Sequence, residues 1–528
     1  MPATFLDLLA DWLPRQRWYP LKGDAGLGAT LRCAGTLELP SSNPGVRFVV
    51  VFVDVTRPVD EGGADDAGHT VTLQVPVALH FSKPVTAPGA SPSGTSLIGE
   101  VGPSDSTFAP PAGEDTGGLT GGWAVDALSD PEFLNAWLAV LTSPQRPASL
   151  STWCSDAFTE AAGMAGDVVD AVRPVTAEQS NSSVVFELAG QRFIAKFLRV
   201  LQAGAHPEVE LGRALAAAGS NNVPALHATV SAPVPAASSS PATLFVIHTF
   251  LDGGRDGWET ALGAASSGTD FAAEARAMGS AVAQVHASLR STLGSAACTG
   301  PDAAAFVETV ISRLRWAWDL AGASVGPYEP ELDAVIDGLR ALRRLPEVQR
   351  IHGDLHLGQL VRAGKPGATG WYLLDFEGEP LRPLAQRGLP DVPLRDVIGM
   401  LRSFDYAGAQ AARGGTVTAD DAAAWTRACC EAFLDGYRGS AAGGDDADPA
   451  LFSALWLDKA LYEVVYELQN RPDWLSVPVL AVRELFESSE RSVDMGMKNA
   501  TPWQWMPESW QVFPRGPTTR RIPYWAPT

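Results

Sequence analysis

Two short segments, separated by about a dozen residues, carry the side chains in this sequence that are best suited to chemistry. They are H-G-D-L-H-L-G-Q at 352–359 and W-Y-L-L-D-F-E at 371–377. Phosphoryl transfer needs a carboxylate that accepts the proton of the attacking hydroxyl, and oxygen ligands for a Mg²⁺ ion on the nucleotide phosphates. Asp354 and Gln359 have the spacing of the base and the metal-binding amide in a kinase loop. The first segment therefore favours a phosphotransferase.

The second segment predicts a short buried strand that delivers Asp375 to its end. We expect Asp375, with Glu377 in reach of the same ion, to join Gln359 as a Mg²⁺ ligand. His352 and the histidine four positions later leave a zinc pair open, but hard carboxylates favour magnesium over zinc. We therefore expect His352 to brace the loop through hydrogen bonds and to lie at the substrate site.

A nucleotide site also needs a lysine that pairs with the phosphates and a glutamate that fixes it. Lys196 lies in the strand-like segment R-F-I-A-K-F-L at 192–198. A helix is predicted over 207–217, because Pro207 and acidic residues mark its first turn. We predict Glu210 on this helix as the partner of Lys196, with Glu208 as the competitor for that role.

A glycine-rich phosphate loop of the G-x-G-x-x-G type is absent at this strand pair. The segment E-Q-S-N-S-S at 178–183 stands in its place. We expect Ser182 and Ser183, with the neighbouring backbone N–H groups, to cover the phosphates. Runs of Ser and Asn are also ordinary turns, so that alternative stays open.

The elements around these segments change from strands to helices along the chain. Alternating apolar residues predict strands at 47–55, 71–81, 183–188, 192–198 and 244–250, and helical patterns cover 272–291, 303–322, 329–344, 391–405, 419–437 and 451–471. Stretches rich in Pro, Gly and Ser at 84–122, 229–242, 252–270 and 438–450 are interpreted as surface loops. This order predicts an α+β, bilobal fold.

Charge and composition exclude several classes of partner. The 528 residues carry a net charge of −21, which disfavours nucleic acids and anionic membrane surfaces as partners. Five dispersed cysteines without a C-x-x-C motif indicate neither a zinc site nor a disulfide framework. With no signal peptide and no long apolar run, we expect a cytoplasmic protein without a membrane span.

Further motifs extend through most of the chain. They are W-L-P-R-Q-R-W at 12–18, D-G-W at 256–258, D-F-E-G-E-P at 375–380, P-L-R-D-V-I-G-M-L-R-S-F-D-Y at 393–406, K-A-L-Y-E-V-V-Y-E at 459–467 and N-R-P-D-W at 470–474. Together with Lys196 and the loop at 352–359, they make the chain resemble the actinobacterial maltokinases. These are relatives of the aminoglycoside phosphotransferases within the protein-kinase-like fold.

The resemblance implies an N-terminal cap domain at 1–150, a nucleotide-binding strand lobe at 151–251 and a helical lobe at 252–500. The aromatic-rich tail at 501–528 departs from the family pattern, and we expect it to fold back over a lobe, with contact to a partner as the alternative. The resemblance implies ATP- and Mg²⁺-dependent phosphorylation of maltose to maltose 1-phosphate, which feeds α-glucan (glycogen) synthesis, and it leaves room for association with other enzymes of that synthesis. The resemblance also implies that Asp354 is the catalytic base.

The sugar acceptor is expected on the late helix. Tyr462 and Tyr466 share a helical face, and Arg471 follows where Pro472 ends the helix. Aromatic faces and guanidinium donors suit a disaccharide, although both tyrosines are also consistent with core packing. Two other functions remain open: a glucosamine or other amino-sugar kinase, and a non-catalytic kinase-like binding protein that uses its aromatic tail.

Overall fold

The structure is a computed structural model of the 528-residue chain. It describes residues 4–21, 28–57, 70–82, 97–102, 105–108, 121–144, 146–166, 168–175, 181–234, 240–342, 344–364, 369–380, 382–440 and 448–494, with side chains to 487. The predicted tail at 501–528 lies outside these residues. Within them, no helix combines the length and the apolar character that crossing a membrane requires.

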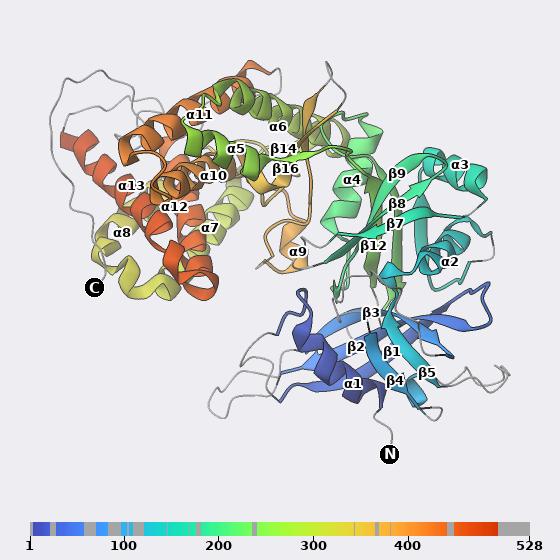
Figure 1. The fold of residues 1–528 in the computed structure, drawn as a ribbon. Coiled ribbons are helices and arrows are strands. Elements are labelled where there is room, and N and C mark those ends of the chain that lie inside the picture. The colour runs from blue at the N-terminus through green and yellow to red at the C-terminus, as the bar shows by residue number, and fades with distance from the viewer. Residues whose placement is uncertain are drawn as a thin grey trace. The chain divides into compact units, whose positions relative to one another are not determined.

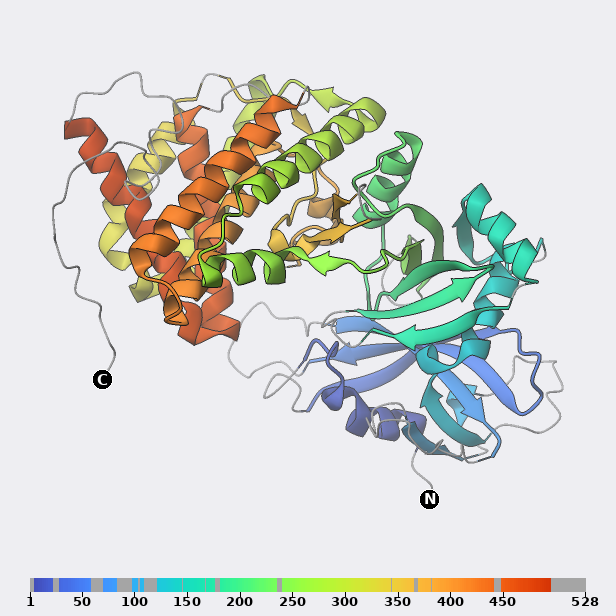
Figure 2. The same ribbon diagram turned by 45° about the horizontal axis from the view of Figure 1, so that its top comes forward.

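The chain forms two compact units, which are described separately (Figures 1 and 2). Unit 1 comprises residues 1–254 and 363–389, and unit 2 comprises 255–362 and 390–528. The segment 363–389, which carries Asp375 and Glu377, thus joins the strand-rich unit, whereas the sequence placed it in the helical lobe. The reason is that this segment contacts the strand with Lys196, as shown below.

Unit 1 begins with an antiparallel sheet of order β1-β2-β3-β5-β4, to which β10 adds by pairing with β3. Its elements are β1 (Thr30–Leu39), β2 (Val46–Thr56), β3 (Thr70–His80), β4 (Leu97–Val101), β5 (Gly122–Asp126) and β10 (Val200–Leu201). Successive β2 residues enter two different cores because side chains alternate across a strand. Phe48 packs with Phe133 of α2 (Pro131–Thr142), and Val49 packs in the core formed with α1 (Phe5–Trp12).

The second sheet of unit 1 has the order β6-β11-β12-β9-β8-β7. Its strands are β6 (Ser151–Cys154), β7 (Asp170–Pro174), β8 (Ser182–Leu188), β9 (Gln191–Phe197), β11 (Leu226–Pro233) and β12 (Pro241–Thr249), with α3 (Asp156–Ala165) and α4 (Pro207–Ala217) nearby in sequence. Lys196 lies on β9 between Ser183 of β8 and Val246 of β12. Helix α4 has the predicted bounds, because Pro207 at its first position and two acids in its first turn favour that start.

Unit 2 is mostly helical. Its helices are α5 (Gly257–Ser267), α6 (Ala272–Leu293), α7 (Gly300–Ala321), α8 (Glu329–Arg340), α10 (Leu394–Arg413), α11 (Ala419–Gly439), α12 (Pro449–Asn470) and α13 (Ser476–Asp494). Helices α6 and α11 lie side by side (Figure 1) and touch through two glycines. A Cβ added at Gly279 or at Gly436 would lie 2.0 Å from a carbonyl oxygen of the other helix. The two helices can therefore approach this closely only because both residues are glycines without a side chain.

Three of the predicted surface loops are wrong in part. In the loop predicted at 84–122, residues 97–101 form β4, which pairs with β5. Residues 257–267 form α5, which Asp256 caps by accepting the Glu259 N–H at 2.8 Å, and which ends at Gly268 in the left-handed conformation. Strand β11 extends into the segment at 229–242, where it pairs with β12. Composition alone suggested loops here, whereas capping and strand pairing satisfy the backbone groups.

Candidate active site

The loop that carries Asp354 is held by the first turn of α10. Asp396 Oδ2 accepts the backbone N–H of His352 at 2.8 Å, and Asp396 Oδ1 accepts the N–H of Gly353 at 2.9 Å. Asp396 also bonds to His286 Nε2 at 3.0 Å. Burial alone raises the pKa of Asp396, but the hydrogen bond and charge of His286, the charge of His352 and the N–H of Gly353 lower it below its ordinary value. The aspartate is therefore held as an anion that organises the loop.

The same face of α10 holds the next part of the loop. A Cβ added at Gly399 would lie 2.2 Å from the carbonyl oxygen of Leu355. One turn further on, Ser403 Oγ accepts the backbone N–H of Leu357 at 2.9 Å. Positions 396, 399 and 403 are three and four residues apart and share a helical face. The register of α10 thus fixes the backbone on both sides of Asp354.

Asp354 faces Lys459 of α12. The Lys459 ammonium lies 3.3 Å from Asp354 Oδ1, and it also lies 5.0 Å from the centre of the Tyr462 ring. The backbone N–H of Asp354 contacts His352 Nδ1 at 3.3 Å, and His352 is buried. The hydrogen bonds expected of His352 are present, and its place at a substrate site stays a prediction.

The predicted sugar residues lie together on α12 and just after it. Tyr466 is 38% exposed, and the Arg471 guanidinium stacks 5.5 Å from its ring centre and 5.3 Å from that of Trp474. Arg471 also donates to the buried Glu467 at 2.6 and 3.0 Å. Tyr466 is therefore accessible to a ligand, and the core-packing alternative does not describe it.

A buried arginine lies beside this surface. Arg402 of α10 is completely buried, donates to Glu463 at 2.6 Å and to Asp405 at 2.5 Å, and stacks on the rings of Tyr406 and Trp456. Burial lowers the pKa of the guanidinium, but Glu463 and Asp405 raise it above its ordinary value. One guanidinium therefore binds two carboxylates in the protein interior.

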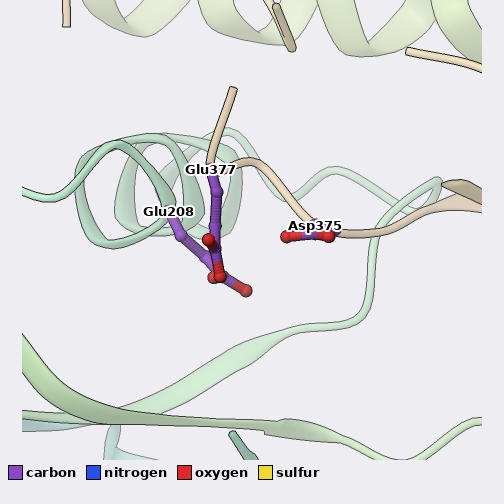
Figure 3. Close-up of side chains that lie close together, drawn as sticks. All are labelled: Glu208, Asp375 and Glu377. Carbon is purple, nitrogen blue, oxygen red and sulfur yellow. The ribbon is translucent and has the colours of Figure 1, made fainter. Parts of the chain in front are cut away.

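In unit 1, three carboxylates lie around one ammonium group. Lys196 Nζ lies 2.5 Å from Glu377, 2.7 Å from Asp375 and 3.2 Å from Glu208. Figure 3 shows Glu208 reaching in from α4 while Asp375 and Glu377 come from the loop after β17 (Gly370–Leu373). Burial lowers the pKa of Lys196, but the carboxylates, Asp375 first, raise it well above its ordinary value.

The structure corrects the predicted partner of Lys196, which is Glu208 rather than Glu210. Both residues lie in the first turn of α4, but side chains two positions apart on a helix point to nearly opposite sides. The face of α4 that is turned towards Lys196 carries Glu208, which is buried. Burial raises the pKa of Glu208 to about 8, although Lys196 lowers it.

The donor set fits a divalent cation. Oxygen atoms of Glu208, Asp375 and Glu377 all lie within 4.8 Å of one another, and hard carboxylate oxygens are the ligands that Mg²⁺ takes. Three carboxylates around one ammonium leave excess negative charge, which a second cation would relieve. Asp375 has φ of 62°, a conformation that costs energy for a residue with a side chain and clusters at functional sites. Gln359 belongs to unit 2, at the end of the short helix η7 (Leu357–Gln359), so its role as a metal ligand stays a prediction.

The serines predicted to cover the phosphates open strand β8. Ser182 Oγ accepts the Arg199 Nε–H at 2.8 Å, and Ser183 is buried opposite Lys196. Asn181 donates to Glu377 at 2.9 Å. Residues 176–180 of this segment lie outside the described residues. The phosphate role of the two serines stays a prediction.

The sequence did not single out several residues of these two sites. Asp396 and Lys459 were noticed only within longer motifs, and their chemistry was not assigned. The sequence also does not single out two histidines near Lys196, the buried His206 and the half-buried His248. Burial lowers the pKa of His206 to about 4 and that of His248 to about 3, so both are neutral at pH 7. Asp396 and Lys459 are far in sequence from the loop residues that they contact, so only the folded structure reveals these contacts.

Two family models match the chain. Residues 171–430 match the phosphotransferase enzyme family, and residues 12–130 match the maltokinase N-terminal cap domain. Two curated relatives, each named glucosamine kinase, are 29% identical. The Mycolicibacterium smegmatis protein aligns over 331 residues, 60% of this chain and 79% of its own length, and the Streptacidiphilus jiangxiensis protein over 350, 62% and 76%.

Solved structures share the fold. A glucosamine kinase in complex with glucosamine, ADP and inorganic phosphate is 22% identical with a TM-score of 0.59. Crystal form B of a glucosamine kinase is 21% identical with a TM-score of 0.60. Each alignment covers 92% of this chain and 100% of the other. The predicted α+β, kinase-like fold with an N-terminal cap is confirmed.

Proposed function

We propose that this chain, in which residues 171–430 match the phosphotransferase enzyme family and residues 12–130 match the maltokinase N-terminal cap domain, is an ATP-dependent sugar kinase that converts maltose to maltose 1-phosphate. The observation that carries the proposal is the Asp354 loop, held by Asp396 and facing α12. A carboxylate fixed in this way suits the removal of a proton from a sugar hydroxyl. The cap domain points to maltose among the sugars.

In this proposal, Asp354 accepts the proton of the anomeric hydroxyl, while Lys196 binds the nucleotide phosphates. Glu208 orients Lys196, and Asp375 and Glu377 are the residues of unit 1 that would hold Mg²⁺. Bound Mg²⁺ supplies positive charge to the phosphates as charge develops on the transferred group. Ser182, Ser183 and Gln359 are proposed to assist at the phosphates and the metal.

The acceptor is proposed to lie against α12. The exposed Tyr466 ring offers an apolar surface, and the Arg471 guanidinium offers hydrogen-bond donors. These groups match the apolar face and the hydroxyl groups of a sugar. Tyr462 and His352 are proposed to line the same site near Asp354. Such a surface suits a disaccharide, because a second ring can contact the aromatic group that the first does not reach.

The second candidate is a glucosamine kinase, which the names of both curated relatives favour. A coupled assay of ADP release with ATP and Mg²⁺ would compare maltose, glucose, glucosamine and an aminoglycoside. We expect the highest kcat/KM with maltose, and phosphorus NMR should identify the product as a 1-phosphate. Turnover of glucosamine alone would establish the second candidate. No turnover of any acceptor, with Mg²⁺-ATP still bound, would favour a non-catalytic binding protein.

A further inference from the structure

A positive charge is fixed beside the proposed proton acceptor. Lys459 Nζ lies 3.3 Å from Asp354 Oδ1, and the two side chains are 15% and 18% exposed. The ammonium also lies over the Tyr462 ring at 5.0 Å. A lysine held by an ion pair and an aromatic face stays in place, unlike one extended into solvent.

The acceptor must come close to this charge. A hydroxyl that gives its proton to Asp354 lies about 2.6–3.2 Å from the carboxylate. A hydroxyl bonded to Asp354 Oδ1, the oxygen that Lys459 contacts at 3.3 Å, therefore lies within about 6.5 Å of Lys459 Nζ. In a 2-amino sugar, the amino group is on the carbon next to the anomeric carbon. An ammonium there lies about one Debye length or less from Lys459, where solvent ions screen the repulsion only partly.

The carboxylates that α12 presents on this side are already paired with arginines. Glu463 follows Lys459 by four residues and binds Arg402 at 2.6 Å, and Glu467 follows by eight and binds Arg471 at 2.6 Å. Arg402 also binds Asp405. An ammonium-bearing acceptor would thus meet two carboxylates of α12 that are each bound to an arginine, together with the ammonium of Lys459 beside Asp354.

We propose that Lys459 is a specificity-determining residue that favours uncharged sugars over sugars that carry an ammonium group. This inference rests on the proposed sugar kinase activity. As the acceptor oxygen bonds to the γ-phosphorus and ADP leaves with the electron pair of the broken bond, the hydroxyl proton moves to Asp354. The carboxylate loses its charge in this step, so it no longer offsets Lys459. Repulsion of an acceptor ammonium therefore grows towards the transition state.

Glucose and glucosamine are the matched probes, because they differ at one position by a hydroxyl or an ammonium. The wild type and the variants Lys459→Met, Lys459→Gln and Lys459→Arg are compared at a pH at which the glucosamine amine is protonated. Each sugar is measured as a substrate or, where it is not turned over, as a competitive inhibitor of maltose phosphorylation. The ratio of the two sugars cancels any general loss of activity that the variants share.

We expect the wild type to favour glucose, and Lys459→Met to shift the ratio towards glucosamine by at least about tenfold, which corresponds to about 1.4 kcal/mol. Lys459→Gln keeps a donor to Asp354 without the charge and should shift the ratio equally, whereas Lys459→Arg should retain the wild-type ratio. An unchanged ratio in the folded Met and Gln variants, or the same shift in Lys459→Arg, overturns the inference. A wild type that phosphorylates no sugar would instead remove the proposed function.

Discussion

Asp396 accepts the backbone N–H of His352 at 2.8 Å, and through this contact helix α10 determines where the following Asp354 lies. The carboxylate is itself oriented by His286 of α6, whose other ring nitrogen contacts the Tyr437 hydroxyl of α11 at 2.9 Å. Helices α10, α6 and α11 of unit 2 are therefore linked by a chain of hydrogen bonds from Asp396 through His286 to Tyr437. The position of the proposed base depends on a packed core rather than on the loop alone.

The first prediction concerns this carboxylate. Asp396→Asn replaces one acceptor oxygen with an NH₂ donor that faces the N–H groups of the loop. We expect kcat to fall about 10²-fold because the base is misplaced, and the free energy of unfolding to fall by about 1–3 kcal/mol because a buried donor loses its acceptor. Steady-state kinetics and urea titration measure both. Asp435→Asn, in an exposed ion pair with Arg276, is the control and should change neither. Wild-type values in Asp396→Asn would contradict the role of this contact.

The second prediction is a pH dependence of the same variant. The folded-state pKa of Asp396 lies below its ordinary value of 3.8, so its ionised form stabilises the fold above about pH 4. This contribution is lost as the pH falls through the lowered pKa. The difference in unfolding free energy between the wild type and Asp396→Asn should therefore shrink as the pH falls below about 4. A difference that grows in that range would reverse the assigned direction of the shift.

The third prediction tests the contact between α10 and the loop. In Gly399→Ala, the new Cβ would lie 2.2 Å from the Leu355 carbonyl oxygen, so the loop or the helix must move. We expect kcat to fall about 10²-fold, because a displacement of about 1 Å near the reacting groups has that effect. Gly263→Ala is the matched control, since Gly263 lies inside α5 with no atom within 4 Å of the added Cβ. It should keep full activity and gain up to about 1 kcal/mol of stability. Equal activity of the two variants would show that the close contact is unimportant.

Much of the fold could be predicted from the sequence because residues that favour a helix start, such as Pro207 and the acids after it, lie within the element they define. Helix α4 was predicted with its observed bounds from Pro207 and the acids that follow it. Helix α5 was missed, since its Gly, Ala and Ser content resembles a loop until the cap at Asp256 is recognised.

The candidate site was predictable where one segment carries its own chemistry, as around Asp354. The partner of Lys196 was not, because the choice between Glu208 and Glu210 depends on which face of α4 is turned towards Lys196. Lys459 lies 105 residues from Asp354, and no local pattern indicates that pairing.

The fourth prediction concerns the proposed base. Asp354→Asn keeps the size of the side chain but removes the proton acceptor. We expect kcat to fall by about 10²–10⁴-fold, the usual contribution of a positioned base. Binding of Mg²⁺-ATP, measured by calorimetry, should be unchanged, because the proposed nucleotide ligands are other residues. A variant that retains full kcat would exclude Asp354 as the base, and one that loses nucleotide binding would indicate a different role.

The fifth prediction separates the two glutamates of α4. Glu208→Gln removes a carboxyl group that binds the half-buried Lys196 ammonium at 3.2 Å, which leaves the lysine less well oriented towards the phosphates. We expect kcat/KM for ATP to fall by about 10–100-fold, with a much smaller change in KM for the sugar. Glu210→Gln is the matched control in the same helical turn, and its effect on kcat/KM for ATP should be smaller by about tenfold. Initial rates with varied ATP at saturating acceptor provide the comparison. A larger loss in Glu210→Gln than in Glu208→Gln would return the role to Glu210, because only the residue that touches Lys196 can orient it.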